Sequence, residues 1–415
     1  MRYIYLLLFC LLAGYGTFAQ EGVGFRDITL EEALQQAQTE NKLVFMDCYT
    51  SWCGPCQEMT KKVFPQKAAG DYFNPRFVSV KYDMEKGAGV ELAKKYEVHA
   101  YPTFLIIRPD GTIQHRLVGA DNLETFIARV EKGLNENTNL AALHRLYKEG
   151  QLDKTGLFGY WEALEEAGED SQAEKVYAEL LEQLTEQEKM QAAYWNLYNT
   201  RSCTIGSPMF NFLLDNLSAI RQNVGEKTVD KFLYEHYSKV LSDHIAGYAK
   251  EDTPSVELLA KHIAGFQING QKSLEQMLTL AGPVSRKEID KVAKMLEQKI
   301  PQASSGEVKM YAFGFRAILW TSQEPYPKQY GKLGKKLSRL LIATMESKAA
   351  SLSGMNLSDY SVALSCFGDV LEQKDYVRLV ALGDKILPNL PDDNDKRHAE
   401  WTFKQYKKYA QPSKK

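Results

Sequence analysis

The stretch that decides the fold is Trp52-Cys53-Gly54-Pro55-Cys56, which follows closely on the apolar run Leu43-Val44-Phe45-Met46. Four consecutive apolar residues bounded by polar ones have the length of a buried strand. After the cysteines, apolar residues recur at helical spacing among charged ones, so we predict that a helix begins at the cysteine pair. Pro55 suits the first turn of that helix, where no backbone N–H is needed. Two cysteines so placed can close a disulfide within one turn.

The predicted helix start gives the two sulfurs unequal roles. Cys53 would lie at the N-terminus, where unpaired N–H groups and the helix dipole favour a thiolate, so we predict that it is the attacking sulfur. Cys56 lies further into the helix and is expected to be less exposed, which makes it the resolving sulfur that breaks a mixed disulfide. We expect Trp52 to cover the site and keep it partly dry.

Asp47 follows the apolar run, six positions before Cys53. A buried carboxylate without a partner is costly, and burial raises its pKa. We therefore predict that Asp47 accepts a proton near neutral pH and deprotonates Cys56 when the mixed disulfide is resolved. The alternative is a structural ion pair of Asp47 with Lys42 or Lys81.

The flanking sequence predicts an alternation of strands and helices. Thr29 and Glu32 fit a capping box for a helix from Leu30 to about residue 41. Pro102 stands at the head of an apolar run, a place where a strand tolerates proline and where a cis bond can be used. The further predicted elements are strands over residues 77–82, 101–107 and 112–118, with a turn at Asp110-Gly111, and helices over residues 90–96 and 123–134.

These residues resemble the thioredoxin family over roughly residues 25–134. The matching motifs are Trp52-Cys53-Gly54-Pro55-Cys56, Asp47 on the preceding strand, Tyr101-Pro102-Thr103 and Val118-Gly119-Ala120. The closer likeness is to the thioredoxin-like domains of exported bacterial thiol:disulfide interchange proteins. It is carried by Val63-Phe64 and by residues 77–83 and 95–103.

The resemblance implies a central mixed sheet flanked by helices and a cis peptide before Pro102. It also implies a redox-active disulfide between Cys53 and Cys56 and a substrate groove in which the backbone of Tyr101 pairs with the substrate chain. The residues that it places along this groove are Trp52, Gly54, Pro55, Tyr101, Pro102 and Gly119.

The N-terminus has the pattern of a secretory signal peptide. One positive charge and a short apolar stretch lead to Thr17-Phe18-Ala19, a small-x-small tripeptide, so we predict cleavage after residue 19. No later segment is long and apolar enough to span a bilayer. We therefore expect a periplasmic protein that is exported and soluble.

The composition of the chain limits the class of partner that we expect. The 51 Lys and Arg residues nearly balance 53 Asp and Glu residues in a chain of 415, which gives no reason to expect nucleic acid or an anionic membrane as partner. Six cysteines are too few for a disulfide-stapled scaffold of this length. The partners that we expect are instead proteins with disulfides and a membrane-bound electron donor.

The remaining cysteines allow other interpretations. Cys48, Cys53 and Cys56 match the spacing of an iron–sulfur loop, but a fourth ligand would have to be Cys203 or Cys366, both far along the chain. A structural zinc site would need a second nearby pair of ligands. We therefore predict no metal and no cofactor. Whether Cys203 and Cys366 pair with each other stays open.

From about residue 137 onwards, strand signals give way to a helical pattern. Residues 160–180 form a helix, a turn at Gly168 and a second helix, similar to one tetratricopeptide unit, and a related pair follows over residues 362–387. We predict an all-α, repeat-like region, which could present a groove for a peptide or partner helix. We expect its aromatics to be core and its acidic run Glu162, Glu165, Glu166 and Glu169 to be a solvated face.

The predicted organisation is a signal peptide over residues 1–19, an α/β thioredoxin-like domain over 20–136 and a helical repeat-like domain over 137–415. The function that follows is an exported thiol:disulfide oxidoreductase that reduces protein disulfides through Cys53 and Cys56. The alternative is a helical adaptor that binds a partner while the thioredoxin-like domain only docks it. His99 and His115 are expected to be surface or packing residues.

Overall fold

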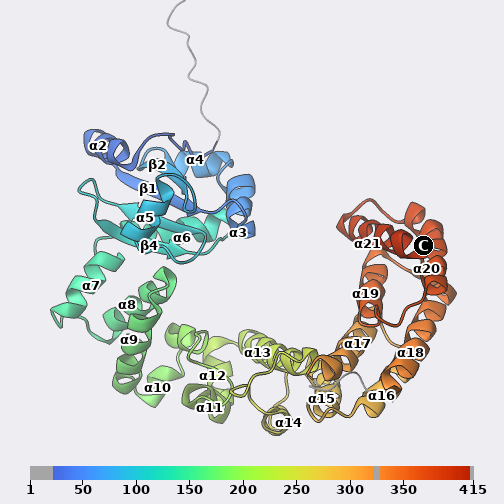
Figure 1. Cartoon of the computed structure of the whole chain (residues 1–415). Helices are drawn as coiled ribbons and strands as arrows, with labels where there is room; N and C mark the ends of the chain where they lie inside the picture. Colours follow the sequence, from blue (N-terminus) through green and yellow to red (C-terminus); the bar gives the residue numbers. More distant parts are fainter. Residues whose placement is uncertain (1–21, 322–327, 412–415) are drawn as a thin grey trace, which may run out of the picture. The chain divides into compact units, whose positions relative to one another are not determined.

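The computed structural model describes residues 22–321 and 328–411 (Figure 1). The signal peptide predicted for residues 1–19 lies outside the described residues. The chain divides into two compact units, Met1–Lys189 and Met190–Lys415. The first unit extends beyond residue 136, because three further helices pack within it. The boundary at residue 137, where we expect the thioredoxin-like part to end, therefore stays a prediction.

The first unit is built on a mixed sheet of four strands in the order β2-β1-β3-β4. Strand β1 (Leu43–Tyr49) runs parallel to β2 (Phe77–Asp83) and antiparallel to β3 (Thr103–Ile107), which pairs with β4 (Ile113–Val118) in a hairpin. β1 is thus a central strand. The mixed sheet with flanking helices that the sequence predicts is confirmed.

The helices around the sheet begin where the sequence places their caps. Helix α2 (Leu30–Glu40) has the predicted capping box, in which Thr29 accepts from the N–H of Glu32 and Glu32 accepts from the N–H of Thr29. Helix α6 (Leu123–Leu134) has Asn122 as its N-cap. Helices α4 (Lys67–Phe73) and α5 (Gly89–Lys95) complete the set around the sheet.

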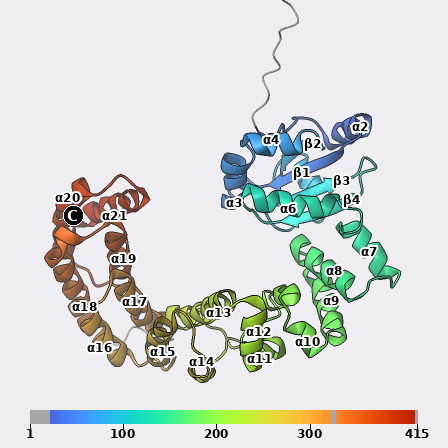
Figure 2. The ribbon, with the colours of Figure 1, turned by 180° about the vertical axis from the view of Figure 1, so that it is seen from behind.

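The two faces of β1 belong to two separate cores. Phe45 packs in a cluster with Met59, Val63 and Phe126, from the segment after the cysteines and from α6. Residues 44, 46 and 48 pack in a second cluster with α2 and α5. Figure 1 shows α5 over one face of the sheet and Figure 2 shows α6 over the other. Because side chains alternate along a strand, Asp47 lies on the face of Phe45, under the cysteine helix.

Three helices extend the first unit, of which the first two pack against β4 and the third packs on the second. They are α7 (Leu140–Lys148), α8 (Lys154–Ala167) and α9 (Asp170–Gln183), and the short helix α10 (Glu186–Lys189) follows. The turn between α8 and α9 is made by Gly168, whose φ of +69° is open to glycine without strain. This is the predicted helix–turn–helix.

Buried polar groups join β4 to α7 and α8. His115 is fully buried, and its Nδ1 accepts a hydrogen bond from the N–H of Leu140 at 3.1 Å. Glu166 accepts from Arg129 at 2.5 Å and lies 3.8 Å from His115 Nε2. The packing role predicted for His115 is confirmed, but the solvated face predicted for the acidic run is wrong at Glu166, because α8 turns this residue towards the sheet.

The second unit, as far as it is described, is helical. The range 362–387, for which a helix pair is predicted, holds the last four residues of α19 (Gly354–Ser365) and the whole of α20 (Gln373–Ile386), and both helices pack against α21 (Asn394–Ala410). The helices longer than three residues are η2 (Ala192–Tyr198), α11 (Pro208–Asp215), α12 (Leu217–Val224), α13 (Glu226–Ala246), α14 (Val256–Ala264), α15 (Gln271–Ser285), α16 (Ile289–Lys299), α17 (Ser305–Trp320), α18 (Lys328–Ser347), α19 (Gly354–Ser365), α20 (Gln373–Ile386) and α21 (Asn394–Ala410). Their repeat-like character stays a prediction.

Aromatic side chains of the helical region are mostly core, as expected. Trp161, Tyr177 and Tyr198 are buried, whereas Tyr194 and Trp195 are half-buried. Trp161 and Tyr177 join α8 to α9, with ring centroids 5.6 Å apart. None of the helices in the described part of the chain is both long and apolar enough to cross a membrane.

Candidate functional site

The cysteine pair lies where the sequence predicts, at the start of helix α3 (Gly54–Glu58). Cys53 is the N-cap residue and is joined to Cys56 by a disulfide. The N–H of Cys56 donates to Cys53 Sγ at 3.1 Å, so this sulfur occupies the position that a capping oxygen would take. Pro55 lies in the first turn. The same donors would stabilise a thiolate on Cys53 once the disulfide is reduced.

The two sulfurs do not differ in exposure. Both Cys53 and Cys56 have an exposed fraction of 3%. The prediction that Cys56 is the less exposed residue is therefore wrong for the disulfide form, because the closed ring holds the two side chains together. Their difference lies in the helix position: Cys53 accepts the N–H at the cap, and Cys56 supplies that N–H from inside the first turn.

Trp52 is an exposed residue directly before the cysteine pair. Its exposed fraction is 66%, and its Nε1–H donates to Glu85 at 3.0 Å. Its ring meets Tyr101 edge to face, with centroids 6.2 Å apart. The hydrogen bond to Glu85 joins the indole to the loop after β2, and the predicted covering role stays a prediction. Glu85 belongs to the site's surroundings, and no pattern in the sequence links it to Trp52.

Asp47 is buried beneath this helix start, with an exposed fraction of 2%. Its Oδ1 has no hydrogen-bond partner among the described residues. Burial raises the pKa of the carboxyl from 3.8 to about 7. The charge of Lys81, the residue of β2 that pairs in register with Asp47, has a smaller effect and lowers this pKa. Lys42 pairs instead with Glu40 at 2.8 Å, so the alternative of an ion pair with Lys42 is not what the structure has.

The loop before β3 forms the second side of the site. The peptide bond between Tyr101 and Pro102 is cis, as the resemblance implies. The carbonyl of Pro102 accepts the N–H of Gly119 at 2.9 Å, which ties the end of β4 to this loop. Gly119 has a φ of +93°, a conformation that side-chain-bearing residues rarely adopt. The structure thus joins three of the segments that the sequence singles out.

The other cysteines take no part in this site. Cys48 is buried in the core on the opposite face of β1, as strand alternation predicts, and it is free. Cys203 and Cys366 are each buried and free, so they do not pair with each other. Within residues 22–321 and 328–411, no cluster of three potential metal ligands occurs.

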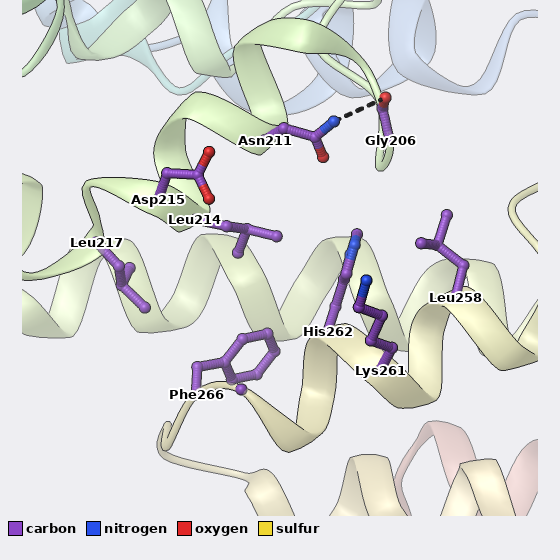
Figure 3. A pocket seen from close by; sticks show the side chains of 10 residues that line it. Gly206, Asn211, Leu214, Asp215, Leu217, Leu258, Lys261, His262 and Phe266 are labelled. Carbon is purple, nitrogen blue, oxygen red and sulfur yellow. Dashed lines mark hydrogen bonds between the residues drawn. The ribbon is translucent and has the colours of Figure 1, made fainter.

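The second unit has a separate cavity of about 580 Å³ between α11, α12 and α14. Figure 3 shows His262 and Lys261 on one side of it and Asn211 and Asp215 on the other. Asn211 donates its amide to the carbonyl of Gly206 at 3.2 Å. The lining contains no cysteine and no serine, so it offers no nucleophile comparable with the pair in the first unit.

Comparison with known proteins shows which family the first unit resembles. The thioredoxin family matches residues 25–132. Thioredoxin-1 of Drosophila melanogaster is 33% identical over 95 residues, which are 22% of this chain and 83% of that protein. The thiol:disulfide interchange protein DsbD of Pseudomonas fluorescens is 30% identical over 103 residues, 24% of this chain but 18% of that protein.

A solved structure from Bacteroides thetaiotaomicron, described provisionally as a disulphide-isomerase, is 50% identical over 28% of this chain and 95% of its own length, with a TM-score of 0.26. The chain spans about half the length of two other curated relatives, 54% of one and 51% of the other.

The mixed sheet, the disulfide at the start of the helix that follows β1 and the cis proline before β3 define a thiol:disulfide oxidoreductase of thioredoxin-like fold. The chain belongs to the thioredoxin family, through residues 25–132.

Proposed function

We propose that the protein is exported and reduces the disulfides of protein substrates by a cycle between the dithiol and disulfide forms of Cys53 and Cys56. The observation that carries this proposal is the pairing of a cap cysteine with a buried carboxyl. Cys53 Sγ accepts the N–H of Cys56 at 3.1 Å, and Asp47, buried on the face of β1 that the segment after the cysteines covers, has no partner for Oδ1.

In the reduced protein, the Cys53 thiolate attacks one sulfur of the substrate disulfide. A bond forms between Cys53 and that sulfur, and the second substrate sulfur leaves as a thiolate. Cys56 then loses its proton to Asp47 and attacks Cys53, which releases the first substrate sulfur and closes the disulfide of the protein. Two electrons pass to the substrate. One substrate thiolate takes up the proton that Asp47 received from Cys56, and the other takes a proton from the solvent, which replaces the one lost when Cys53 ionised.

A carboxyl with a pKa of about 7 is suited to this proton transfer. At neutral pH it is half ionised, so it can accept the proton of Cys56 and return it without a large free-energy penalty in either direction. An ordinary surface aspartate would be ionised at that pH and would return a proton poorly. Tyr101 and Pro102 are proposed to bind the substrate backbone beside the disulfide, and Trp52, Gly54, Pro55 and Gly119 to line the same groove.

Reduction requires a supply of electrons. The Gly-Pro pair between the cysteines is that of reducing thioredoxins, whereas the exported location is oxidising. We therefore propose that a membrane-bound donor with a dithiol of its own reduces the Cys53–Cys56 disulfide after each turnover. The likeness to the interchange protein DsbD supports this donor class.

The test is a trap for the mixed disulfide in the full-length protein. The Cys56→Ser variant lacks the resolving sulfur, so we expect it to accumulate covalent complexes with disulfide-containing proteins, seen as slower bands on non-reducing gels. Cys53→Ser should trap none. Cys203→Ser, which alters a buried free cysteine in the second unit, is the matched control and should behave as the wild type. No trapping by folded Cys56→Ser would contradict the mechanism.

Insulin reduction separates this function from the adaptor alternative. Because α7 and α8 pack against β4 and bury His115, the fragment to compare with the mature protein is residues 20–189 rather than 20–136. We expect equal activity in both. Absence of activity in both would favour an adaptor whose helical region does the work.

A further inference from the structure

Next to the disulfide, the first unit has a cavity of about 390 Å³ that the proposed cycle does not use. One wall consists of the cysteine helix and its π-helical continuation η1 (Met59–Val63), and the other is the loop from β4 into α6. π-helical turns are rare and are often found at functional sites. The cavity lies within one compact unit, so its walls are fixed relative to each other.

Each wall of the cavity directly follows, in sequence, a segment that lies beside the reactive sulfurs. Glu58, on the first wall, follows Cys56 by two residues. Ala120, on the second wall, follows Gly119, whose N–H donates to the carbonyl of Pro102 at 2.9 Å. A polypeptide that reaches Cys53 beside Pro102 therefore has this cavity within the reach of side chains close to its own cysteine.

The floor of the cavity is apolar. Met59 and Val63 are buried members of the core that includes Phe126, and half-buried Ala120 and Leu123 pack against the same core. The hydrophobic core thus reaches the surface at this point. An apolar group placed here would gain the free energy of leaving water without displacing any part of the protein.

The polar side chains on the rim already have partners in the protein. The pairs are Lys62 with Glu58 at 2.9 Å, Gln66 with the carbonyl of Lys62 at 2.7 Å, Asp121 with Arg129 at 2.7 Å, and Asn122 with the N–H of Thr125 at 3.1 Å. The polar groups therefore lie at the rim and are partly engaged within the protein, whereas the floor, where a bound group would be buried, consists of apolar side chains. The cavity therefore favours an aliphatic or aromatic group.

We propose that this cavity is a subsite for an aliphatic or aromatic side chain that lies close in sequence to the reactive cysteine of the substrate. This inference rests on the proposed function and specifies its substrates: disulfide-bearing polypeptides with apolar residues beside the cysteine, as occur in chains that have not folded. It also assigns a specificity-determining role to Leu123 and Ala120, which line the cavity.

The test uses reduced full-length protein and short peptides with one cysteine capped as the mixed disulfide with thionitrobenzoate. Attack by Cys53 on the peptide sulfur releases the coloured thiolate, the better leaving group, and its absorbance in a single turnover gives the second-order rate constant, which serves as kcat/KM for the comparison of peptides. The peptides differ only in carrying leucine or serine at each of the three positions on either side of the cysteine. We expect leucine to raise kcat/KM by about tenfold over serine at one or two of these positions.

Two variants assign that preference to the cavity. Leu123→Asp places a carboxylate on the floor in the first turn of α6, where the helix dipole tolerates a negative charge. Ala120→Leu fills the cavity. Each should lower the leucine-to-serine ratio to about 1. The matched control is Ile28→Asp, a half-buried position just before the capping residue Thr29 that lines a different groove, and it should keep the ratio of the wild type.

A wild-type protein that reacts with all peptides equally would overturn the subsite and leave the proposed function intact. So would a tenfold preference that survives in both Leu123→Asp and Ala120→Leu. If the wild type releases no coloured thiolate from any peptide, the proposed function fails, and the subsite fails with it.

Discussion

Asp47, which is buried, and Glu166, whose side chain is 15% exposed, are carboxyl groups of the first unit with opposite surroundings. Asp47 lies beneath the disulfide with no partner for Oδ1, and its pKa is raised to about 7. Glu166 is a residue of α8 and faces His115 of β4. Burial alone would raise its pKa, but His115 and Arg129 outweigh that effect, and the pKa is lowered. The comparison teaches that burial by itself does not mark a functional carboxyl; burial without a partner does.

The two carboxyl groups also differ in role: Glu166 contributes to stability and Asp47 to function. Glu166 joins α8 to α6 and β4, and its pKa is lowered by Arg129 and His115. Asp47 costs free energy when it is ionised, because no donor compensates the lost hydration. A structure keeps such a group only where its titration is of use, and Asp47 lies on the strand face covered by the cysteine helix.

The largest effect on stability is expected from removing the unpaired charge. The folded state keeps Asp47 protonated up to about pH 7, whereas the unfolded chain loses that proton near 3.8, so stability falls as the pH rises between these values. Asp47→Asn should therefore stabilise the first unit by up to about 4 kcal/mol at pH 9 and by almost nothing at pH 4. Urea unfolding followed by hydrogen exchange of β1 measures this difference.

The control for this variant is Asp27→Asn, which changes an exposed carboxyl before α2. It should leave the unfolding free energy within about 0.5 kcal/mol of the wild type at both pH values. A stabilisation by Asp47→Asn that is equal at pH 4 and pH 9 would show that the charge is not its cause.

Glu166→Gln should act in the opposite direction. Removing this carboxylate leaves Arg129 with one fewer partner in a mostly buried place, so we expect a loss of about 3 kcal/mol at neutral pH. Because the folded pKa of Glu166 is lowered, its contribution is present above the unfolded pKa and is lost as the pH falls through the folded one. Hydrogen exchange of α8 and β4 reports the loss.

Glu182→Gln, at an exposed position on α9, is the matched control and should change little. If Glu166→Gln were neutral, the ion pair would contribute nothing, and the joint between β4 and α8 would depend on apolar packing alone.

The smallest effect concerns Lys81, the cation that lowers the pKa of Asp47 from across the sheet. Its side chain is exposed, so the solvent weakens its influence. We expect Lys81→Gln to raise the pKa of Asp47 by less than about one unit, seen as a shift in the pH dependence of mixed-disulfide resolution. Lys148→Gln should leave it unchanged, and a downward shift with Lys81→Gln would contradict the arrangement.

Most of the first unit could be predicted from local signals. The capping box at Thr29, the apolar strand before Asp47 and the turn into β4 lie within a few residues of the elements they define. The disulfide position and the burial of Asp47 follow from the same kind of signal, since a helix start and the alternation of a strand are local properties.

What could not be predicted depends on residues far apart in sequence. The exposure of Trp52 is set by a hydrogen bond to Glu85, 33 positions away. The burial of Glu166 is set by Arg129, 37 positions away, and the charged run alone resembles a solvated face. The equal burial of the two sulfurs follows from the closed ring, which the spacing allows but does not require.

The most direct test of the account is the titration of Asp47 itself in the oxidised protein. The carboxyl carbons of aspartate, labelled with ¹³C, can be followed by NMR between pH 3 and pH 10, and the signal missing from Asp47→Asn identifies the residue. The account predicts a midpoint near 7 for this signal. A midpoint near 4 would show that Asp47 is an ordinary ionised carboxylate at neutral pH and would contradict its role in proton transfer.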